Sequence, residues 1–143
     1  MTILERGKTM MEQMQTKKVS IRKLVNEFDV DVAFMPSEID YFITTTDINR
    51  PGLQLSGYYD HFPSERIQVI GKVEYSYYSS LDEETKMDRM DRYMSYELPV
   101  IIVAREQQPD EIMIQAAKKY NRIVLTTPMG TTKFIYKLLD YLK

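Results

Sequence analysis

The last third of the chain shows the clearest hydrophobic pattern. Residues 100–104 and 123–125 are two continuous apolar runs of strand length, as expected for strands covered on both faces. Between them, an amphipathic segment begins at Pro109, carries a pair of lysines in its last turn and ends at Asn121, which are typical start and stop signals of a helix. Strand, helix and strand in this order predict a βαβ crossover with a parallel pair of strands.

The preceding residues alternate between short helical and strand patterns. A helix is predicted after Ser20, which is placed to act as its N-cap, because Ile21, Leu24, Val25 and Phe28 form one apolar stripe. The pattern predicts further strands at 30–34, 41–45 and 66–70, and further helices at 53–57, at 74–81, from a capping box at 80–83 to about 93, and from Thr131 or Thr132 onward.

Two details of these elements carry their own expectations. The aromatic content of residues 74–81 also allows a strand there, although the helix is favoured. The buried stripe of the helix after the capping box is expected to consist of Met87, Met90 and Met94. Taken together, the elements predict an α/β fold, a layered domain whose mixed sheet includes the parallel βαβ pair.

The first 18 residues differ from the rest of the chain. They have a local excess of positive charge, and their methionines would form one face of a short helix with no adjacent partner segment. We therefore expect residues 1–18 to be a flexible N-terminal extension and residues 19–143 to be the folded domain. A length of 143 residues is compatible with one such domain.

Composition excludes several classes of function. The formal net charge is −2, which argues against nucleic-acid binding, because such domains concentrate basic residues on one face. There is no cysteine and His61 is the single histidine, so neither a metal site nor a Ser-His-Asp triad is expected. The sequence has no apolar run long enough to span a membrane and no secretory signal, so we expect no membrane partner and a cytoplasmic protein.

No catalytic residue can be assigned from the sequence. Gly7-Lys8-Thr9 resembles the end of a phosphate-binding P-loop, but Thr2 stands where that motif requires another glycine. Acidic residues between 82 and 91 alternate with basic ones at helical spacing and are expected to be a solvated helix face rather than a cation site. The chain alone is therefore predicted to be inactive as an enzyme and to need no cofactor.

Two features remain as candidates for binding. Ligands of open α/β sheets tend to bind beyond the carboxyl ends of the strands, where this chain carries Arg105 and a loop that leads into a helix N-terminus, with Thr127, Gly130, Thr131 and Thr132. Simple capping of the helix by Thr131 or Thr132 is the favoured interpretation, and the binding of an anion at the helix N-terminus is the alternative. The tyrosines, which suit either an interface with another protomer or the edge of the core, are Tyr58, Tyr59, Tyr75, Tyr77, Tyr78, Tyr93 and Tyr96.

Residues 47–74 closely resemble a segment of the N-terminal domain of bacterial HPr kinase/phosphorylase. The positions that carry the motif are Asp47, Arg50, Pro51, Gly52, Gly57, Tyr58, Glu65, Arg66 and Gly71. Weaker agreement covers residues 19–28, 98–105 and 131–135, so the resemblance extends over the whole expected domain. The chain departs from the family at Met35-Pro36-Ser37-Glu38, where the family often has a glycine-containing turn, and in the basic residues 1–18.

The resemblance implies a parent enzyme that phosphorylates a serine of HPr with ATP or pyrophosphate and Mg²⁺, reverses that modification, and so links the phosphotransferase system to carbon catabolite regulation. In the family, a P-loop kinase domain that carries the catalytic residues follows this domain. The resemblance also implies a fold similar to the N-terminal domain of the Mur ligases. The function expected for this chain is regulatory or assembly-related, with the kinase domain as a partner, HPr as a partner of the parent enzyme, and a homo-oligomer formed through the tyrosine-rich region. The alternative is a stand-alone module that binds a sugar phosphate or a UDP-sugar-like molecule.

Overall fold

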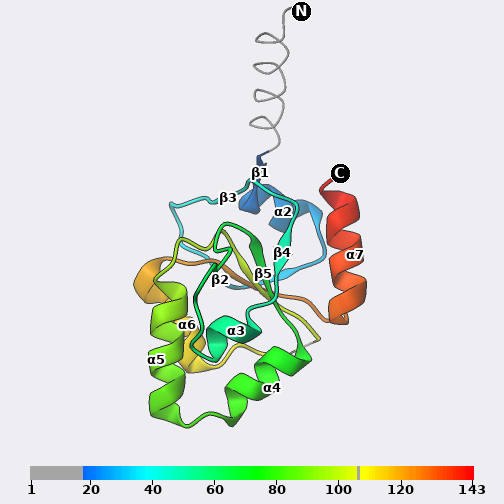
Figure 1. Cartoon of the computed structure of the whole chain (residues 1–143). Coiled ribbons are helices and arrows are strands. Elements are labelled where there is room, and N and C mark those ends of the chain that lie inside the picture. Colours follow the sequence, from blue (N-terminus) through cyan, green and yellow to red (C-terminus); the bar gives the residue numbers. More distant parts are fainter. Residues whose placement is uncertain (1–17, 106) are drawn as a thin grey trace, which may run out of the picture.

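A five-stranded mixed sheet forms the centre of the molecule (Figure 1). The computed structural model describes residues 18–105 and 107–143. In spatial order, the strands of the sheet are β2 (Asp31–Phe34), β7 (Val124–Thr126), β6 (Ile101–Val103), β5 (Ile67–Ile70) and β4 (Ile48–Asn49). The last four run parallel to one another, and β2 pairs antiparallel with β7 at one edge.

Helices cover both faces of the sheet, and alternate strand residues contribute to two separate cores. Ile70, Ile101, Val103 and Val124 pack into one core, whereas the intervening strand residues pack into the other. The two-residue period of a strand explains this division. The first core is completed by α3 (Gly52–Leu55), α4 (Lys72–Ser80), α5 (Glu83–Met94) and α6 (Glu111–Tyr120), and the second by α2 (Ile21–Glu27) and α7 (Thr131–Tyr141).

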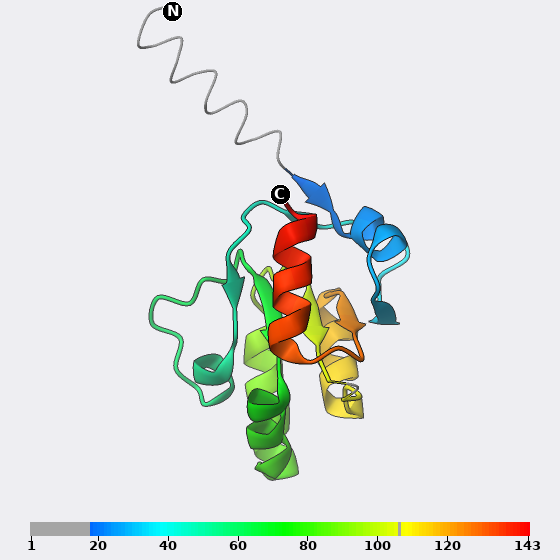
Figure 2. The ribbon, with the colours of Figure 1, turned by 90° about the vertical axis from the view of Figure 1, so that its right-hand side faces the viewer.

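Figure 2 shows α7 lying along one face of the sheet, with α4 and α5 extending from the other end of the molecule. A separate two-stranded antiparallel ribbon of β1 (Val19–Ser20) and β3 (Phe42–Ile43) lies beside α2, near the C-terminal end of α7 (Figure 1). Tyr141 of α7 donates a 2.6 Å hydrogen bond from its hydroxyl to the Glu27 carboxylate of α2. These contacts place both ends of the described chain at the same pole of the molecule.

The predicted βαβ unit is confirmed as β6, α6 and β7, with the two strands parallel. Asp110 caps α6 by accepting a 2.9 Å hydrogen bond from the Met113 N–H. Asn121 ends the helix in the left-handed conformation, at φ 58°, which asparagine tolerates better than most residues. The helix expected near residues 74–81 is also present, as α4.

Two details of the α5 prediction were wrong. The N-cap is Asp82 and not Ser80, because the Asp82 carboxylate accepts a 2.8 Å hydrogen bond from the Thr85 N–H, while the Ser80 hydroxyl donates to the carbonyl of Tyr77 at the end of α4. Met87 does not belong to the buried stripe, since 57% of it is exposed. The stripe consists of Met90, Tyr93 and Met94, with Tyr93 in place of Met87.

The predicted extension, residues 1–18, lies outside the described part of the chain except for Lys18, as does Gly7-Lys8-Thr9. Within residues 18–105 and 107–143, no helix combines the length and the apolar character that crossing a membrane would require.

Candidate functional site

The four parallel strands all end at one edge of the sheet, and a polar or glycine residue follows each of them closely. Arg50 comes after β4, Gly71 after β5, Arg105 after β6 and Thr127 after β7. We call this edge the C-terminal edge. A cavity of about 270 Å³ opens there, lined by Arg50, Lys72, Val73, Arg105, Thr131 and Thr132. The structure brings Arg105 and Thr131 to one cavity together with Arg50 and Lys72, and the binding role of these residues stays a prediction.

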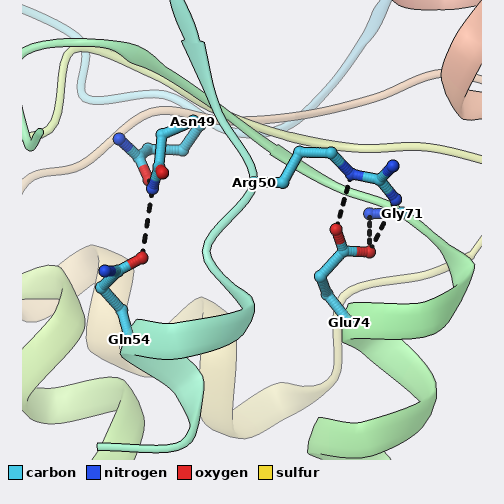
Figure 3. A network of polar contacts seen from close by, with 6 residues as sticks. Asn49, Arg50, Gln54, Gly71 and Glu74 are labelled. Atoms are coloured by element: carbon cyan, nitrogen blue, oxygen red, sulfur yellow. Dashed lines mark hydrogen bonds and ion pairs between the residues drawn. The ribbon is translucent and has the colours of Figure 1, made fainter. Parts of the chain in front are cut away.

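An ion pair links the end of β4 to the start of α4 (Figure 3). The Arg50 Nε lies 2.6 Å from Glu74 Oε1, and the Arg50 Nη2 lies 2.9 Å from Glu74 Oε2. Glu74 Oε2 also accepts a 3.1 Å hydrogen bond from the Gly71 N–H, so the carboxylate occupies the N-terminus of α4. Only 8% of the Glu74 side chain is exposed, against 43% for Arg50. The two-pronged contact holds the guanidinium in one orientation at the wall of the cavity.

Gly71 allows three elements to approach one another closely. A Cβ atom at this position would lie 2.5 Å from Arg50 Nη2, 2.6 Å from Thr131 Oγ1 and 3.1 Å from Glu74 Oε2. The first two distances are shorter than any normal van der Waals contact. Only glycine therefore fits between the side chains of Arg50, Thr131 and Glu74 without movement of these neighbours.

Arg105 has an unusual backbone conformation at the opposite wall of the cavity. Its φ is 61°, in the left-handed region, and its N–H donates a 2.9 Å hydrogen bond to the Met129 carbonyl. The left-handed region costs a residue with a Cβ about 1–2 kcal/mol. The Arg105 guanidinium extends over the N-terminus of α7, with Cζ 3.7 Å from where a Cβ of Gly130 would be. Strain of this kind in a solvent-facing arginine points to a function for the side chain.

The cavity has an excess of positive charge. Among its lining residues Arg50, Lys72 and Arg105 are basic, and Glu74 forms an ion pair with Arg50. Within the described residues, neither Lys72 nor Arg105 has a carboxylate partner within 4 Å. The result is a local excess of two positive charges in a chain whose formal net charge is −2. Such a site favours an anionic ligand.

The threonines and the glycine of the predicted loop take different positions. Thr131 is 5% exposed and, with Thr132, lines the cavity, while Gly130 is the N-cap of α7. Thr127 lies beneath the site at 1% exposure. Its N–H donates to the Val103 carbonyl at 3.0 Å and its hydroxyl accepts from the Met129 N–H at 3.3 Å. Thr127 therefore shapes the loop. Of the four residues predicted in this loop, the two that line the cavity, Thr131 and Thr132, belong to α7.

A second polar network, beside the ion pair, was not anticipated from the sequence. Asn49 Nδ2 donates to Gln54 Oε1 at 3.2 Å (Figure 3). It also donates to Gln68 Oε1 at 2.8 Å, and the buried hydroxyl of Tyr93 donates to the same Gln68 oxygen at 2.9 Å. Gln68 is fully buried and also donates to the Arg66 carbonyl at 3.0 Å. This network fixes β4, α3 and β5 together, immediately before Arg50 and Gly71.

The other motif residues serve the backbone or lie on the surface. Gly57 adopts φ 98°, which favours glycine, and the Arg89 guanidinium packs against it. Pro51 is buried at the start of α3, and a Cβ at Gly52 would make only an ordinary contact, with Glu74 Cγ at 3.8 Å. Asp47 and Arg66 form a 4.0 Å surface ion pair, and Tyr58 and Glu65 are exposed or partly exposed.

The tyrosine-rich region divides between core and surface. Tyr78 and Tyr93 are fully buried, whereas Tyr58 and Tyr77 are 50% and 40% exposed. Tyr59 stacks on Tyr96 with ring centroids 5.1 Å apart, and burial raises the pKa of Tyr59 to about 12. Tyr78 and Tyr93 therefore belong to the core, and the interface with another protomer stays a prediction for the exposed Tyr58 and Tyr77.

No acidic or histidine cluster in the described residues has the composition of a metal site. His61 stands in a surface turn with φ 59°, and it lies outside the residues that line the C-terminal edge cavity. Both findings concern residues 18–105 and 107–143. The chemistry that the C-terminal edge offers is the binding of an anion by arginine, lysine, hydroxyl and backbone N–H groups.

Comparison with a solved structure supports the fold. The chain superimposes with a TM-score of 0.52, at 17% identity and over 79% of its length, on 42% of a crystallised chain that comprises the CBS and DRTGG domains of the regulatory region of Clostridium perfringens pyrophosphatase, complexed with its activator diadenosine tetraphosphate. At this level of identity the likeness shows a shared α/β arrangement.

Comparison of sequences places the chain among kinase relatives. The chain is 43% identical over 128 residues to the HPr kinase/phosphorylase of Peptoclostridium acidaminophilum, and 40% identical over 127 residues to that of Alkaliphilus metalliredigens. These alignments cover 90% and 89% of this chain but 42% and 41% of the relatives. The chain thus spans about two-fifths of the length of the relatives that it matches.

The family model described as HPr Serine kinase N terminus matches residues 19–142. This range includes every described helix and strand, the ion pair of Arg50 with Glu74, and the cavity at the C-terminal edge. The segment between residues 47 and 74, which carries the resemblance in the sequence, supplies two of the walls of that cavity. The chain therefore belongs to the family of HPr serine kinase N-terminal domains.

Proposed function

We propose that residues 19–143 form a non-catalytic, regulatory or assembly domain of an HPr kinase/phosphorylase, with residues 1–18 as an N-terminal extension. The observation that carries the proposal is the family match over residues 19–142 combined with coverage of only about two-fifths of the relatives. A P-loop is absent from the sequence, which supports a separate source for the phosphoryl-transfer chemistry.

The partners of the domain follow from this proposal. A kinase domain would supply the catalytic residues, the site for ATP or pyrophosphate, and Mg²⁺, in a cytoplasmic enzyme that phosphorylates and dephosphorylates a serine of HPr in carbon catabolite regulation. The exposed surface around Tyr58 and Tyr77, together with the 61% exposed Leu53, supports contact with another protomer, because tyrosine is enriched at interfaces.

The proposal is tested by comparing two proteins in an HPr phosphorylation assay. The 143-residue chain alone is expected to transfer no phosphate to HPr in the presence of ATP and Mg²⁺. A chimera in which this chain replaces the matching N-terminal part of the Peptoclostridium acidaminophilum enzyme is expected to retain the activity. Sedimentation of both proteins compares their oligomeric states. Phosphorylation of HPr by the 143-residue chain, in proportion to its concentration, would refute the proposal.

The cavity at the C-terminal edge favours a second function, the binding of a small molecule. The arrangement of Arg50, Lys72 and Arg105 around a cavity of about 270 Å³ supports an anionic ligand such as a sugar phosphate or a UDP-sugar-like molecule. A fold similar to the N-terminal domain of the Mur ligases would agree with this choice. A bound nucleotide activator in the crystallised regulatory region of the pyrophosphatase, a protein of related fold, makes a ligand-controlled role reasonable.

Calorimetric titration of the chain with sugar phosphates and UDP-sugars tests the second function. We expect heat of binding from at least one of these compounds, and none from the corresponding uncharged sugars, because the cavity offers cationic donors. The absence of binding at millimolar concentrations of every compound would remove this function and leave the first untouched.

A further inference from the structure

Helix α7 begins without an acceptor for its first N–H groups. Its N-cap is Gly130, which has no side chain to accept them, and the first bond of the helix is from the Phe134 N–H to the Gly130 carbonyl, at 2.9 Å. Within the described residues, the N–H groups of residues 131–133 have no acceptor. In contrast, Ser20, Asp82 and Asp110 cap α2, α5 and α6 with side-chain oxygens.

A second observation at the same place is independent of the helix. The side chain of Thr131 lines the cavity although the residue is only 5% exposed, and its hydroxyl makes no hydrogen bond to any described residue. Among the described residues, Thr131 Oγ1 is not one of the enclosed atoms without a partner, so it is accessible from the solvent-filled space. Its Oγ1 atom and the N–H groups of the first turn of α7 therefore offer donors to the same small space.

The position of Arg105 adds a third observation. Its guanidinium lies over Gly130, at the end of α7 that carries the positive partial charge of the helix dipole. A cation is disfavoured there unless an anion lies between them, and the φ of 61° at Arg105 adds backbone strain. Both costs are explained if an anion bridges the guanidinium and the helix N-terminus.

We propose that the first turn of α7, the Thr131 hydroxyl, Arg105 and Lys72 form a cradle for the phosphoryl group of a small phosphate monoester. This inference deepens the second proposed function, the binding of a small molecule, by naming the group that is recognised. Arg50 borders the cradle and can contact the ligand, but its positive charge is already balanced by Glu74. The remaining donors match the three outer oxygens of a phosphoryl group.

Charge and volume select among phosphate-bearing ligands. The local excess of two positive charges matches a dianion, which a phosphate monoester carries in large part at neutral pH. The cavity volume of about 270 Å³ lies just below the range of about 300–1,000 Å³ that is typical of sites for larger ligands. A sugar monophosphate therefore fits better than a nucleotide sugar, of which the greater part would remain outside.

The test uses glucose 6-phosphate as the probe, glucose as the uncharged comparison and UDP-glucose as the larger one, with the full chain observed by amide NMR and calorimetry. Glucose 6-phosphate is expected to shift the amide signals of residues 131–133, and glucose is expected to shift none. Thr131→Val, which removes the hydroxyl at nearly constant volume, and Arg105→Gly are each expected to weaken binding by about tenfold or more. Lys137→Gln, further along α7 and outside the cavity, is the matched control and is expected to bind normally.

Arg105→Gly separates a ligand-binding role from a structural one. Glycine adopts a φ of 61° without strain, so this variant is expected to have a higher melting temperature than the wild type while binding glucose 6-phosphate more weakly. Unchanged affinity of Arg105→Gly for glucose 6-phosphate would overturn the cradle, whatever the melting temperature of the variant.

The remaining outcomes distinguish the cradle from the proposed functions. Binding of glucose 6-phosphate with amide shifts confined to another part of the chain, or UDP-glucose binding more tightly than glucose 6-phosphate, would overturn the cradle and leave small-molecule binding intact. No binding of any probe would overturn both the cradle and the proposed binding of a small molecule. The chimera assay with HPr tests the regulatory function separately.

Discussion

Replacing Gly71 with alanine is expected to destabilise the domain by about 1–3 kcal/mol, the range for inserting a methyl group into a well-packed site. The new Cβ would lie 2.5 Å from Arg50 Nη2 and 2.6 Å from Thr131 Oγ1. The guanidinium cannot simply turn away, because Glu74 holds it through two atoms, and the Thr131 side chain would have to leave its rotamer to make room. The measurement is the free energy of unfolding in urea at pH 7.

Two other glycines of the motif provide matched controls for Gly71→Ala. At Gly52 a Cβ would have its nearest neighbour, Glu74 Cγ, at the ordinary distance of 3.8 Å, so Gly52→Ala is expected to be neutral or stabilising by up to about 1 kcal/mol. At Gly57 the φ of 98° makes any Cβ strained, and Gly57→Ala is expected to cost about 1–2 kcal/mol. A Gly71→Ala variant as stable as Gly52→Ala would contradict the close approach of Arg50 and Thr131 to Gly71.

Arg50→Ala is expected to destabilise the domain by about 2 kcal/mol. Removing one member of a wholly buried ion pair costs about 3–5 kcal/mol, because the other charge remains buried, and the 43% exposure of Arg50 reduces that figure through solvent screening. In this variant Glu74 keeps its hydrogen bond from the Gly71 N–H but has no counter-charge within its contacts among the described residues.

A double-mutant cycle with Glu74→Gln isolates the ion pair. Glutamine retains an oxygen that can accept from the Gly71 N–H but carries no charge, so Arg50→Ala is expected to cost less in the Glu74→Gln background than in the wild type. Urea unfolding of the wild type, both single variants and the double variant gives the coupling energy, which is expected to be about 1–2 kcal/mol. Equal effects of Arg50→Ala in the two backgrounds would show that the buried charge of Glu74 contributes nothing to that cost.

The sequence predicted best those elements whose signals are local. The strand runs at 100–104 and 123–125 are buried on both faces, and the helix between them has its own cap at Asp110 and its own stop at Asn121. The antiparallel pairing of β2 with β7 could not be predicted in the same way, because it joins segments that are about 90 residues apart and depends on the whole sheet. Competing local hydrogen bonds decided the start of α5, where Asp82 caps the helix and the Ser80 hydroxyl donates to the Tyr77 carbonyl at the end of α4.

The candidate site was predicted in part. Arg105 and Thr131 were expected together because each follows a strand of the βαβ unit, and the structure brings them to one cavity. Arg50 and Gly71 were known only as motif residues, although each also directly follows a strand at the same edge. A position directly after a strand is the sequence feature that Arg50 and Gly71 share with the other site residues. It groups them only when the order of the strands in the sheet is known, and the hydrophobic pattern of the sequence does not give that order. The Glu74 contact depends on the orientation of α4 and had no signal in the sequence.

Helix α7 joins two distant parts of the molecule. Its first residue lines the cavity, and its last turn packs against α2 through Tyr141 and Glu27. Eleven residues of helix span about 16 Å, and a hydrogen-bonded helix resists stretching along its axis. A shift of Thr131 by a fraction of an ångström would therefore be carried as a rigid translation to Leu142 and Lys143. In this respect the helix mechanically connects the positively charged cavity to the pole where both ends of the described chain lie.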